Sequence, residues 1–522
     1  MRWLAAAVLV GALVRLPGVA WGVNWPDGFT IHHIDEYTHI ANADAIITPL
    51  GPSTGVPYPK AMAAYAAFPI LVWYAAHGSF GGPRVHLPWT VGAGRLISVL
   101  FGIAAILIVF AVGRDALGDE HAGTLAAWLM ALGGLHVTMS HFFLADVPAL
   151  TWTLLATWLL WRDLTQVDPS NHEPLRWAAF AAGAAFALKL FVFVLPALAY
   201  TVLARPPRLR RALHAAIFLL AGLSISSLGF DTPTAFYRAA TLGSHHAFEF
   251  DRVRSALLFA IQFPSIFSLP LLLLATAGTC ALALRLRNAE AVRRRHALVV
   301  FGSVPLVALA FVLLKLDPFV RHLLILIPWA AVAGGWALAK WTAALKRQGR
   351  SPALVLTPVF LWMSIFVIDG ERFFIFEPRN NALRWLRTNV PPGTSMNWMG
   401  RRAPNGYRSV RWMVEGKPDV LVIEMSEANH SLSGVNWKNS YPSDFHQVYD
   451  GRSAERVAAI QALFQGTSEY TMVARFPEQY VMPEYRLTMA LLGDRSRSFI
   501  TEVVVFTRRA APLAGSVAAT GG

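Results

Sequence analysis

The chain has 522 residues, of which 55% are hydrophobic and only 15% charged, and its formal net charge is +14. Apolar runs of about 18 to 20 residues recur along it, which excludes an ordinary soluble domain and predicts a polytopic α-helical membrane protein. The basic excess does not indicate nucleic-acid binding, because the cations concentrate in short loops between apolar segments, as membrane insertion requires.

Eleven apolar segments are predicted to cross the membrane. The first is interpreted as an uncleaved helix rather than a signal peptide, because Arg15 interrupts it. A further apolar stretch, 61–79, is predicted to lie within the first outer loop, residues 22–94, without spanning. The crossings are expected at about residues 3–21, 95–113, 122–138, 148–162, 175–188, 190–204, 212–229, 256–285, 297–314, 319–339 and 352–369.

With these crossings, the loops between them alternate between basic loops and loops with few lysines and arginines. Sixteen lysines and arginines, between Arg114 and Arg350, then fall in five alternate short loops. Short loops rich in lysine and arginine stay in the cytoplasm, so the remaining loops face the periplasm or exterior of a cell membrane. The polar residues of those outer loops therefore emerge on one face of the membrane.

The chain changes character after residue 370. Residues 371–509 have ordinary polarity and predict a small α/β domain outside the cytoplasm, appended to the transmembrane domain of residues 1–370. Helices are expected over 380–389 and 454–464 and strands over 419–425 and 498–507. The tail, 510–522, is rich in Ala, Gly and Ser and is predicted to be disordered.

The first outer loop carries the most unusual polar stretch, with the adjacent carboxylates Asp35 and Glu36 among histidines. Carboxylates next to hydrocarbon are costly unless they meet water, a cation or a proton. Three interpretations stay open: a catalytic carboxylate, a solvated polar loop, and a metal site using His32 and His39. The only cysteine, Cys280, lies in an apolar run and excludes a Cys-based metal site.

Other outer-face charges are candidates for the same site. Asp146 comes just before Pro148, so it is either a second catalytic carboxylate or the N-cap of the next helix. Lys189 divides about 30 apolar residues and is expected either to mark a structural turn or to contact a phosphate. Arg321 opens a crossing, where its guanidinium suits either Asp317 or a lipid phosphate.

Short motifs that occur in a set order are spread over most of the chain. They are Arg15; Asp35-Glu36; Tyr58-Pro59-Lys60; Gly94 to Ser98; Val112-Gly113-Arg114; Ser140 to Asp146; Ala187-Leu188-Lys189; Arg321 to Pro328; Arg379 to Leu386; and Pro391-Pro392-Gly393. In this order the chain resembles the integral-membrane glycosyltransferases of the protein O-mannosyltransferase and lipid A aminoarabinose transferase type, with the C-type glycosyltransferase fold. The resemblance implies a polyprenyl-phosphate-linked sugar donor and Asp35 as the base.

The expected reaction is transfer of the sugar, with inversion, to a protein, lipid or glycan acceptor on the outer side. Lys189 and Arg321, together with Lys60, are expected to hold the donor phosphate, with Asp35, Glu36 and Asp146 as the catalytic carboxylates. No cofactor is required by this chemistry, and a divalent metal stays open. The alternative is a polytopic transporter or flippase for a lipid-linked or anionic substrate, since intramembrane charges also mark transport paths.

Overall fold

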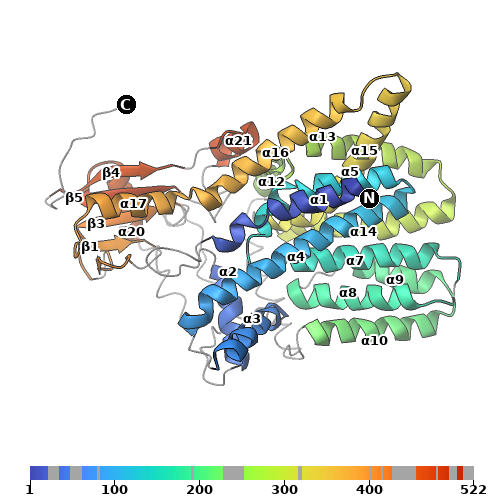
Figure 1. The fold of residues 1–522 in the computed structure, drawn as a ribbon, viewed down its shortest axis with the longest axis horizontal. Helices are drawn as coiled ribbons and strands as arrows, with labels where there is room; N and C mark the ends of the chain where they lie inside the picture. Colours follow the sequence, from blue (N-terminus) through green and yellow to red (C-terminus); the bar gives the residue numbers. More distant parts are fainter. Residues whose placement is uncertain are drawn as a thin grey trace. The chain divides into compact units, whose positions relative to one another are not determined.

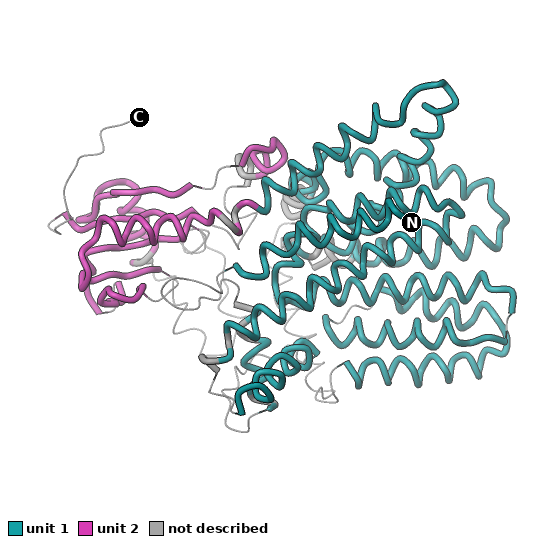
Figure 2. Tube along the Cα trace, viewed as in Figure 1, with its two compact units in different colours: residues 1–24, 29–371 teal, residues 25–28, 372–522 magenta. Residues whose placement is uncertain are grey.

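The computed structural model describes most of the chain, in two compact units. The described residues up to Glu371 form the membrane unit, and those from Arg372 onward form the second unit (Figure 2). The described residues are 1–21, 34–47, 61–78, 83–168, 170–189, 193–226, 252–315, 320–399, 403–412, 415–425, 454–477, 480–492 and 502–509.

The membrane unit is built from helices (Figure 1). They are α1 (Arg2–Leu13), η1 (Pro17–Ala20), α2 (Ile34–Ile47), α3 (Ala61–His77), α4 (Pro83–Leu117), α5 (Glu120–Ala131), α6 (Gly134–Met139), α7 (Asp146–Thr165), α8 (Glu173–Lys189), α9 (Leu195–Ala204), α10 (Arg208–Ser226), α12 (Arg252–Phe267), α13 (Leu269–Arg287), α14 (Ala291–Lys315), η2 (Val320–Leu326), α15 (Ile327–Arg347) and α16 (Ala353–Ile375).

Six helical segments in the described part of the chain are long and apolar enough to cross a membrane, within α1–η1, α4, α10, α13, η2–α15 and α16. The protein is therefore mostly helical and multi-pass, whereas eleven crossings stay a prediction. Helix α3 has 17 residues, or about 26 Å at about 1.5 Å per residue, against a hydrocarbon core of about 30 Å. Helix α9 has only 10 residues, so the crossing expected over 190–204 contains a shorter helix than predicted.

Several of the predicted continuous crossings are broken, including 3–21, which divides into α1 and η1. The segment 122–138 divides at Gly133 into α5 and α6, and 256–285 divides at Ser268 into α12 and α13. Ser268 has a φ of 64°, outside the helical region, and a proline occupies the first turn of α13. Apolar composition does not reveal such breaks, because a kinked pair of helices can be as hydrophobic as a single one.

Glycines let several helices of the membrane unit approach closely. A Cβ added at Gly183 of α8 would lie 2.1 Å from the carbonyl oxygen of Leu219, and one at Gly222 of α10 would lie 2.0 Å from that of Phe180. A Cβ at Gly278 of α13 would likewise lie 1.9 Å from a carbonyl oxygen of α15. Small residues at such contacts are typical of helices that associate in lipid, where backbone packing replaces the hydrophobic effect.

The loops that carry the sixteen cations join helices at one end of the membrane unit, on the right in Figure 1. Several of these cations close the loops: Arg205 Nη2 donates to the Leu164 carbonyl at 2.6 Å, and Arg285 Nη1 to that of Leu117 at 3.1 Å. Helices α2 and α3, the start of α7 and the end of α8 lie at the opposite end (Figure 1). The structure thus separates the cation-rich end from the end that holds the candidate site.

The second unit contains a five-stranded sheet with strand order β2-β1-β3-β5-β4. Strand β1 is parallel to β2 and β3, and β5 is antiparallel to β3 and β4. The strands are β1 (Ser395–Trp398), β2 (Arg408–Ser409), β3 (Val420–Glu424), β4 (Tyr470–Phe476) and β5 (Val503–Arg508), and the helices are α17 (Pro378–Asn389), α20 (Ala454–Phe464) and α21 (Pro483–Leu492).

Both faces of this sheet are covered. Val420 and Val422 pack with Leu386 of α17, whereas Leu421 and Ile423 pack with Ile460 of α20. The continuous apolar run of β3 reflects this burial on both sides, since successive side chains of a strand point to opposite faces. The predicted helices and the two predicted strands occur here, and β1, β2 and β4 are additional.

Candidate active site

Helix α2 is fixed near its N-terminus by a fully buried ion pair between Glu36 and Arg95 of α4. Arg95 Nε donates to Glu36 Oε1 and Arg95 Nη2 to Glu36 Oε2, both at 2.8 Å. The Phe143 N–H also donates to Glu36 Oε1, at 2.8 Å. Both charged side chains are 0% exposed. This parallel two-bond geometry is the strongest form of arginine–carboxylate contact, and both carboxylate oxygens of Glu36 are engaged within the protein.

Arg95 extends this anchor to the end of the first helical segment. Its Nη1 donates to the carbonyl oxygens of Val19 and Trp21, and its guanidinium carbon lies 5.6 Å from the centre of the Trp21 ring. One arginine therefore ties together the chain after η1, helix α4 and helix α2. Arg95 is consequently engaged within the protein and is not a free phosphate-binding cation.

A second buried pair holds α2 nearer its C-terminus. His86 Nε2 of α4 lies 3.0 Å from Asp44 Oδ1, and both side chains are nearly inaccessible, at 1% and 3% exposed. Asp44 follows Glu36 by eight residues, or about two turns, so both face α4 from one side of the helix. Helix α2 is thus clamped at two levels. The backbone of Asp35, the expected base, lies within this clamped helix.

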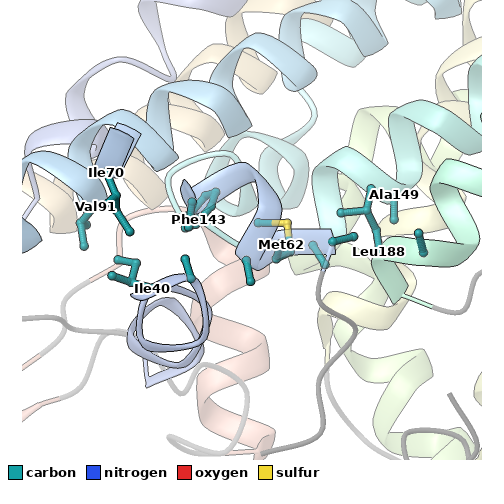
Figure 3. Packing of buried hydrophobic residues seen from close by; sticks show 13 residues of the cluster. Ile40, Met62, Ile70, Val91, Phe143, Ala149 and Leu188 are labelled. Atoms are coloured by element: carbon teal, nitrogen blue, oxygen red, sulfur yellow. The ribbon is translucent and has the colours of Figure 1, made fainter. Parts of the chain in front are cut away.

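A hydrophobic cluster joins α2 and α3 to the ends of α7 and α8. Ile40 of α2 and Met62 of α3 gather with Phe143, Ala149 of α7 and Leu188 of α8 (Figure 3). All five side chains are almost fully buried. Leu188 directly precedes Lys189, and Ala149 follows Asp146 by three residues, or about one helical turn. The cluster therefore holds α2 in one body with both of those charged positions.

Asp146 and Lys189 form an ion pair at these helix ends. Lys189 Nζ donates to Asp146 Oδ1, with the lysine side chain 24% exposed and the carboxylate 6% exposed. The capping residue of α7 is Ala145, and Asp146 is the first residue of the helix. The N-cap interpretation of Asp146 is therefore wrong. Its carboxylate instead pairs with Lys189, the last residue of α8, which lies 43 residues away along the chain.

The structure gives less detail on the remaining candidate site residues. Arg321 is partly buried on η2, which contacts α6 and α7. His39 is buried on α2, with its ring edge-to-face against Phe143 at a centroid distance of 6.2 Å. Among the residues that the structure describes, no group of three or more His, Cys, Asp or Glu side chains is positioned to hold a metal ion. His32, Lys60 and the side chain of Asp35 lie outside the described part.

Sequence reasoning missed a buried polar network beside this site. Glu371, near the end of α16, accepts a hydrogen bond from Thr138 of α6 at 2.9 Å and pairs with His141 Nε2. Nearby, Arg15 is fully buried with its Nη2 2.8 Å from His136 Nδ1. The signal in the sequence was the unusual run of two histidines and a threonine around residue 138, all inside or next to an apolar segment.

Residues 90–230 match the family model of the dolichyl-phosphate-mannose-protein mannosyltransferases, a stretch that contains Arg95, Asp146 and Lys189. The match confirms the resemblance, indicated by the sequence motifs, to membrane glycosyltransferases of the protein O-mannosyltransferase type. No curated protein sequence matches the chain.

Solved structures with similar chain traces include ArnT from Cupriavidus metallidurans bound to undecaprenyl phosphate, at 13% identity and a TM-score of 0.49, over 96% of this chain and 97% of that one. The Archaeoglobus fulgidus oligosaccharyltransferase in complex with Zn and sulfate has 13% identity and a TM-score of 0.48, over 97% and 88%. The S. cerevisiae protein O-mannosyltransferase Pmt1-Pmt2 complex bound to the sugar donor has 16% identity and a TM-score of 0.34, over 45% and 33%.

Proposed function

We propose that the protein transfers a sugar from a polyprenyl-phosphate-linked donor to an acceptor on the non-cytoplasmic side of a cell membrane, with Asp35 as the base. One observation carries the proposal. The helix that contains Asp35 is clamped by the buried Glu36–Arg95 ion pair and the buried Asp44–His86 contact, and it shares a hydrophobic cluster with the helix ends where Asp146 and Lys189 meet. A carboxylate-bearing helix and a partly exposed cation therefore belong to one rigid end of the membrane unit.

In the proposed reaction, an acceptor hydroxyl attacks the anomeric carbon while Asp35 takes its proton. The bond from the anomeric carbon to the lipid phosphate breaks, and the phosphate leaves with the electron pair. Phosphate is a good leaving group, so a single carboxylate base suffices, and one displacement inverts the anomeric centre. The second unit, proposed as an extracytoplasmic domain, would lie on the same side as the acceptor.

The cations have the role of stabilising the departing phosphate. Lys189 is partly exposed, and its pairing with Asp146 keeps the ammonium compensated and oriented before an anionic donor arrives. Arg321 on η2 supplies a second positive charge from the segment packed on α6 and α7. Lys60 stays a third candidate. Glu36 is reassigned from catalysis to positioning, because its carboxylate is fully buried and bonded to Arg95 and Phe143.

The test incubates the purified protein with a panel of polyprenyl-phosphate sugars and measures release of free lipid phosphate. Asp35→Asn keeps the side chain's size but removes the base, so we expect the rate to collapse while donor binding persists. Glu290→Gln is the matched control, an exposed carboxylate between α13 and α14. Absence of lipid phosphate release with every sugar refutes the reaction. Near-normal turnover by Asp35→Asn would instead move the base to Asp146.

A further inference from the structure

A cavity of about 440 Å³ lies at the cation-rich end of the membrane unit, away from the proposed transfer site. It is lined by loop residues 170–173, by Arg176 and Trp177 of α8, and by Arg210 and Phe218 of α10. The loop is well braced, because Gln166 Nε2 donates to the Asn171 carbonyl at 2.7 Å and the Glu173 N–H to Asn171 Oδ1 at 3.0 Å. The cavity is thus formed by ordered secondary structure and a hydrogen-bonded turn.

Two side chains that line this cavity, and His214 beside Arg176, carry polar nitrogens that lack protein partners. Within the described residues, Arg176 Nε, His172 Nδ1 and His214 Nδ1 are buried without a hydrogen-bond partner, although Arg176 Nη2 lies 3.3 Å from His214 Nε2. His172 is only 5% exposed. A buried guanidinium nitrogen left unpaired is costly, and an anionic acceptor in the cavity would relieve that cost.

The local charge favours an anion. Arg211, next to Arg210 on α10, pairs with Asp163 at 2.5 Å and does not line the cavity, whereas Arg176 and Arg210 line it with the single carboxylate of Glu173. Glu173 lies in the first turn of α8, where a carboxylate complements the helix dipole. Burial, followed by the positive charges of Arg211 and Arg210, lowers the pKa of His172, which is consistent with a positive potential at this position.

Apolar side chains continue from the cavity along the same two helices. The Trp177 and Phe218 rings meet edge to face at 6.2 Å, and Arg176 lies 5.9 Å from the centre of the Phe218 ring. Farther along α10, Leu213 and Ile217 are more than half exposed. Because α10 is long and apolar enough to cross a membrane, this surface borders hydrocarbon while its basic end borders the headgroup layer.

We propose that this cavity binds the phosphate group of an anionic phospholipid from the leaflet that borders the cation-rich loops. Arg176 and Arg210 contact the phosphate oxygens, and the acyl chains follow Trp177 and the exposed apolar side of α10. A guanidinium suits this role because its N–H donors match the geometry of phosphate oxygens. It is also less strongly hydrated than an ammonium group. Basic pockets between membrane helices are recognised binding places for anionic lipid headgroups. The site is independent of the proposed transfer reaction.

The test uses the purified full chain in nanodiscs of phosphatidylcholine with a minor fraction of phosphatidylglycerol, and native mass spectrometry counts the lipids retained after release. We expect preferential retention of phosphatidylglycerol by the wild type. The double variant Arg176→Gln/Arg210→Gln should weaken retention by roughly tenfold or more, since each cation near an anionic lipid contributes about a fivefold factor. The matched control is Arg347→Gln/Arg350→Gln, which removes two exposed cations from the same end of the unit.

Equal retention by the cavity variant and the wild type overturns the proposal, as does an equal loss in the Arg347/Arg350 control, which would mean diffuse charge attraction. A competition arm adds inorganic phosphate. We expect no displacement of lipid at millimolar phosphate, whereas displacement would identify a soluble-anion site instead. If the double variant fails to fold, Arg210→Gln alone decides the matter, because Arg210 is exposed and its loss should weaken retention by about fivefold.

Discussion

The Glu36–Arg95 pair offers the sharpest test of how α2 is held. Both side chains are 0% exposed, and removing one partner leaves the other charge buried without compensation, which costs about 3 to 5 kcal/mol. In Glu36→Gln the amide oxygen can still accept the Phe143 N–H, so we expect a value near the lower end, about 3 kcal/mol. That corresponds to about a hundredfold shift in the unfolding equilibrium.

Unfolding of the membrane unit in mixed detergent micelles, followed by tryptophan fluorescence, measures this loss. The double variant Glu36→Gln/Arg95→Gln should be less unstable than the sum of its two single variants, because neither then strands a buried charge. Arg114→Gln is the control, since its pair with Asp115 is 46% and 23% exposed and is expected to contribute less than about 1 kcal/mol. If Glu36→Gln costs no more than Arg114→Gln, the clamp does not hold α2 and the argument for a rigid Asp35-bearing helix fails.

Three further predictions address the donor site, the packing and the topology. Lys189→Ala and Arg321→Ala should each weaken donor use by roughly ten- to a hundredfold, with Arg321→Lys intermediate because a point charge cannot form a bidentate fork; unchanged donor binding with lower thermal stability would make both residues structural. Gly222→Ala should destabilise the α8–α10 contact by about 1 to 3 kcal/mol in the same unfolding assay, since its Cβ would lie 2.0 Å from the Phe180 carbonyl oxygen, and wild-type stability would refute close backbone packing there. In a Cys280→Ala background, Arg208→Cys should react with a thiol reagent only from the cytoplasm and Thr388→Cys only from outside; labelling of both from one side contradicts the proposed topology.

Much of the local structure was predictable from residue patterns. Helix α20 occupies the residues expected, 454–464, and β3 lies within the run expected as a strand, because local apolar periodicity and turn residues are properties of the chain itself. The short strands β1 and β2 were not predicted, since four and two residues are too few for a periodic signal. Their conformation depends on tertiary pairing, of β1 with β3 and of β2 with β1. The breaks inside apolar segments were missed for a related reason: hydropathy does not record backbone direction.

The candidate site, too, was predictable from the sequence only in part. Composition alone indicated a multi-pass membrane protein, motif order indicated the resemblance to membrane glycosyltransferases, and loop charge predicted that the polar candidate residues gather on one side of the membrane. Only the tertiary structure decided which polar side chains meet: Glu36 with Arg95 across 59 residues, Asp146 with Lys189 across 43, and His141 with Glu371 across 230. A carboxylate is equally compatible with many cations along a sequence. The packing of helices selects one of them, because the cost of burying an unpaired charge is met only where the opposite charge is brought within hydrogen-bond distance.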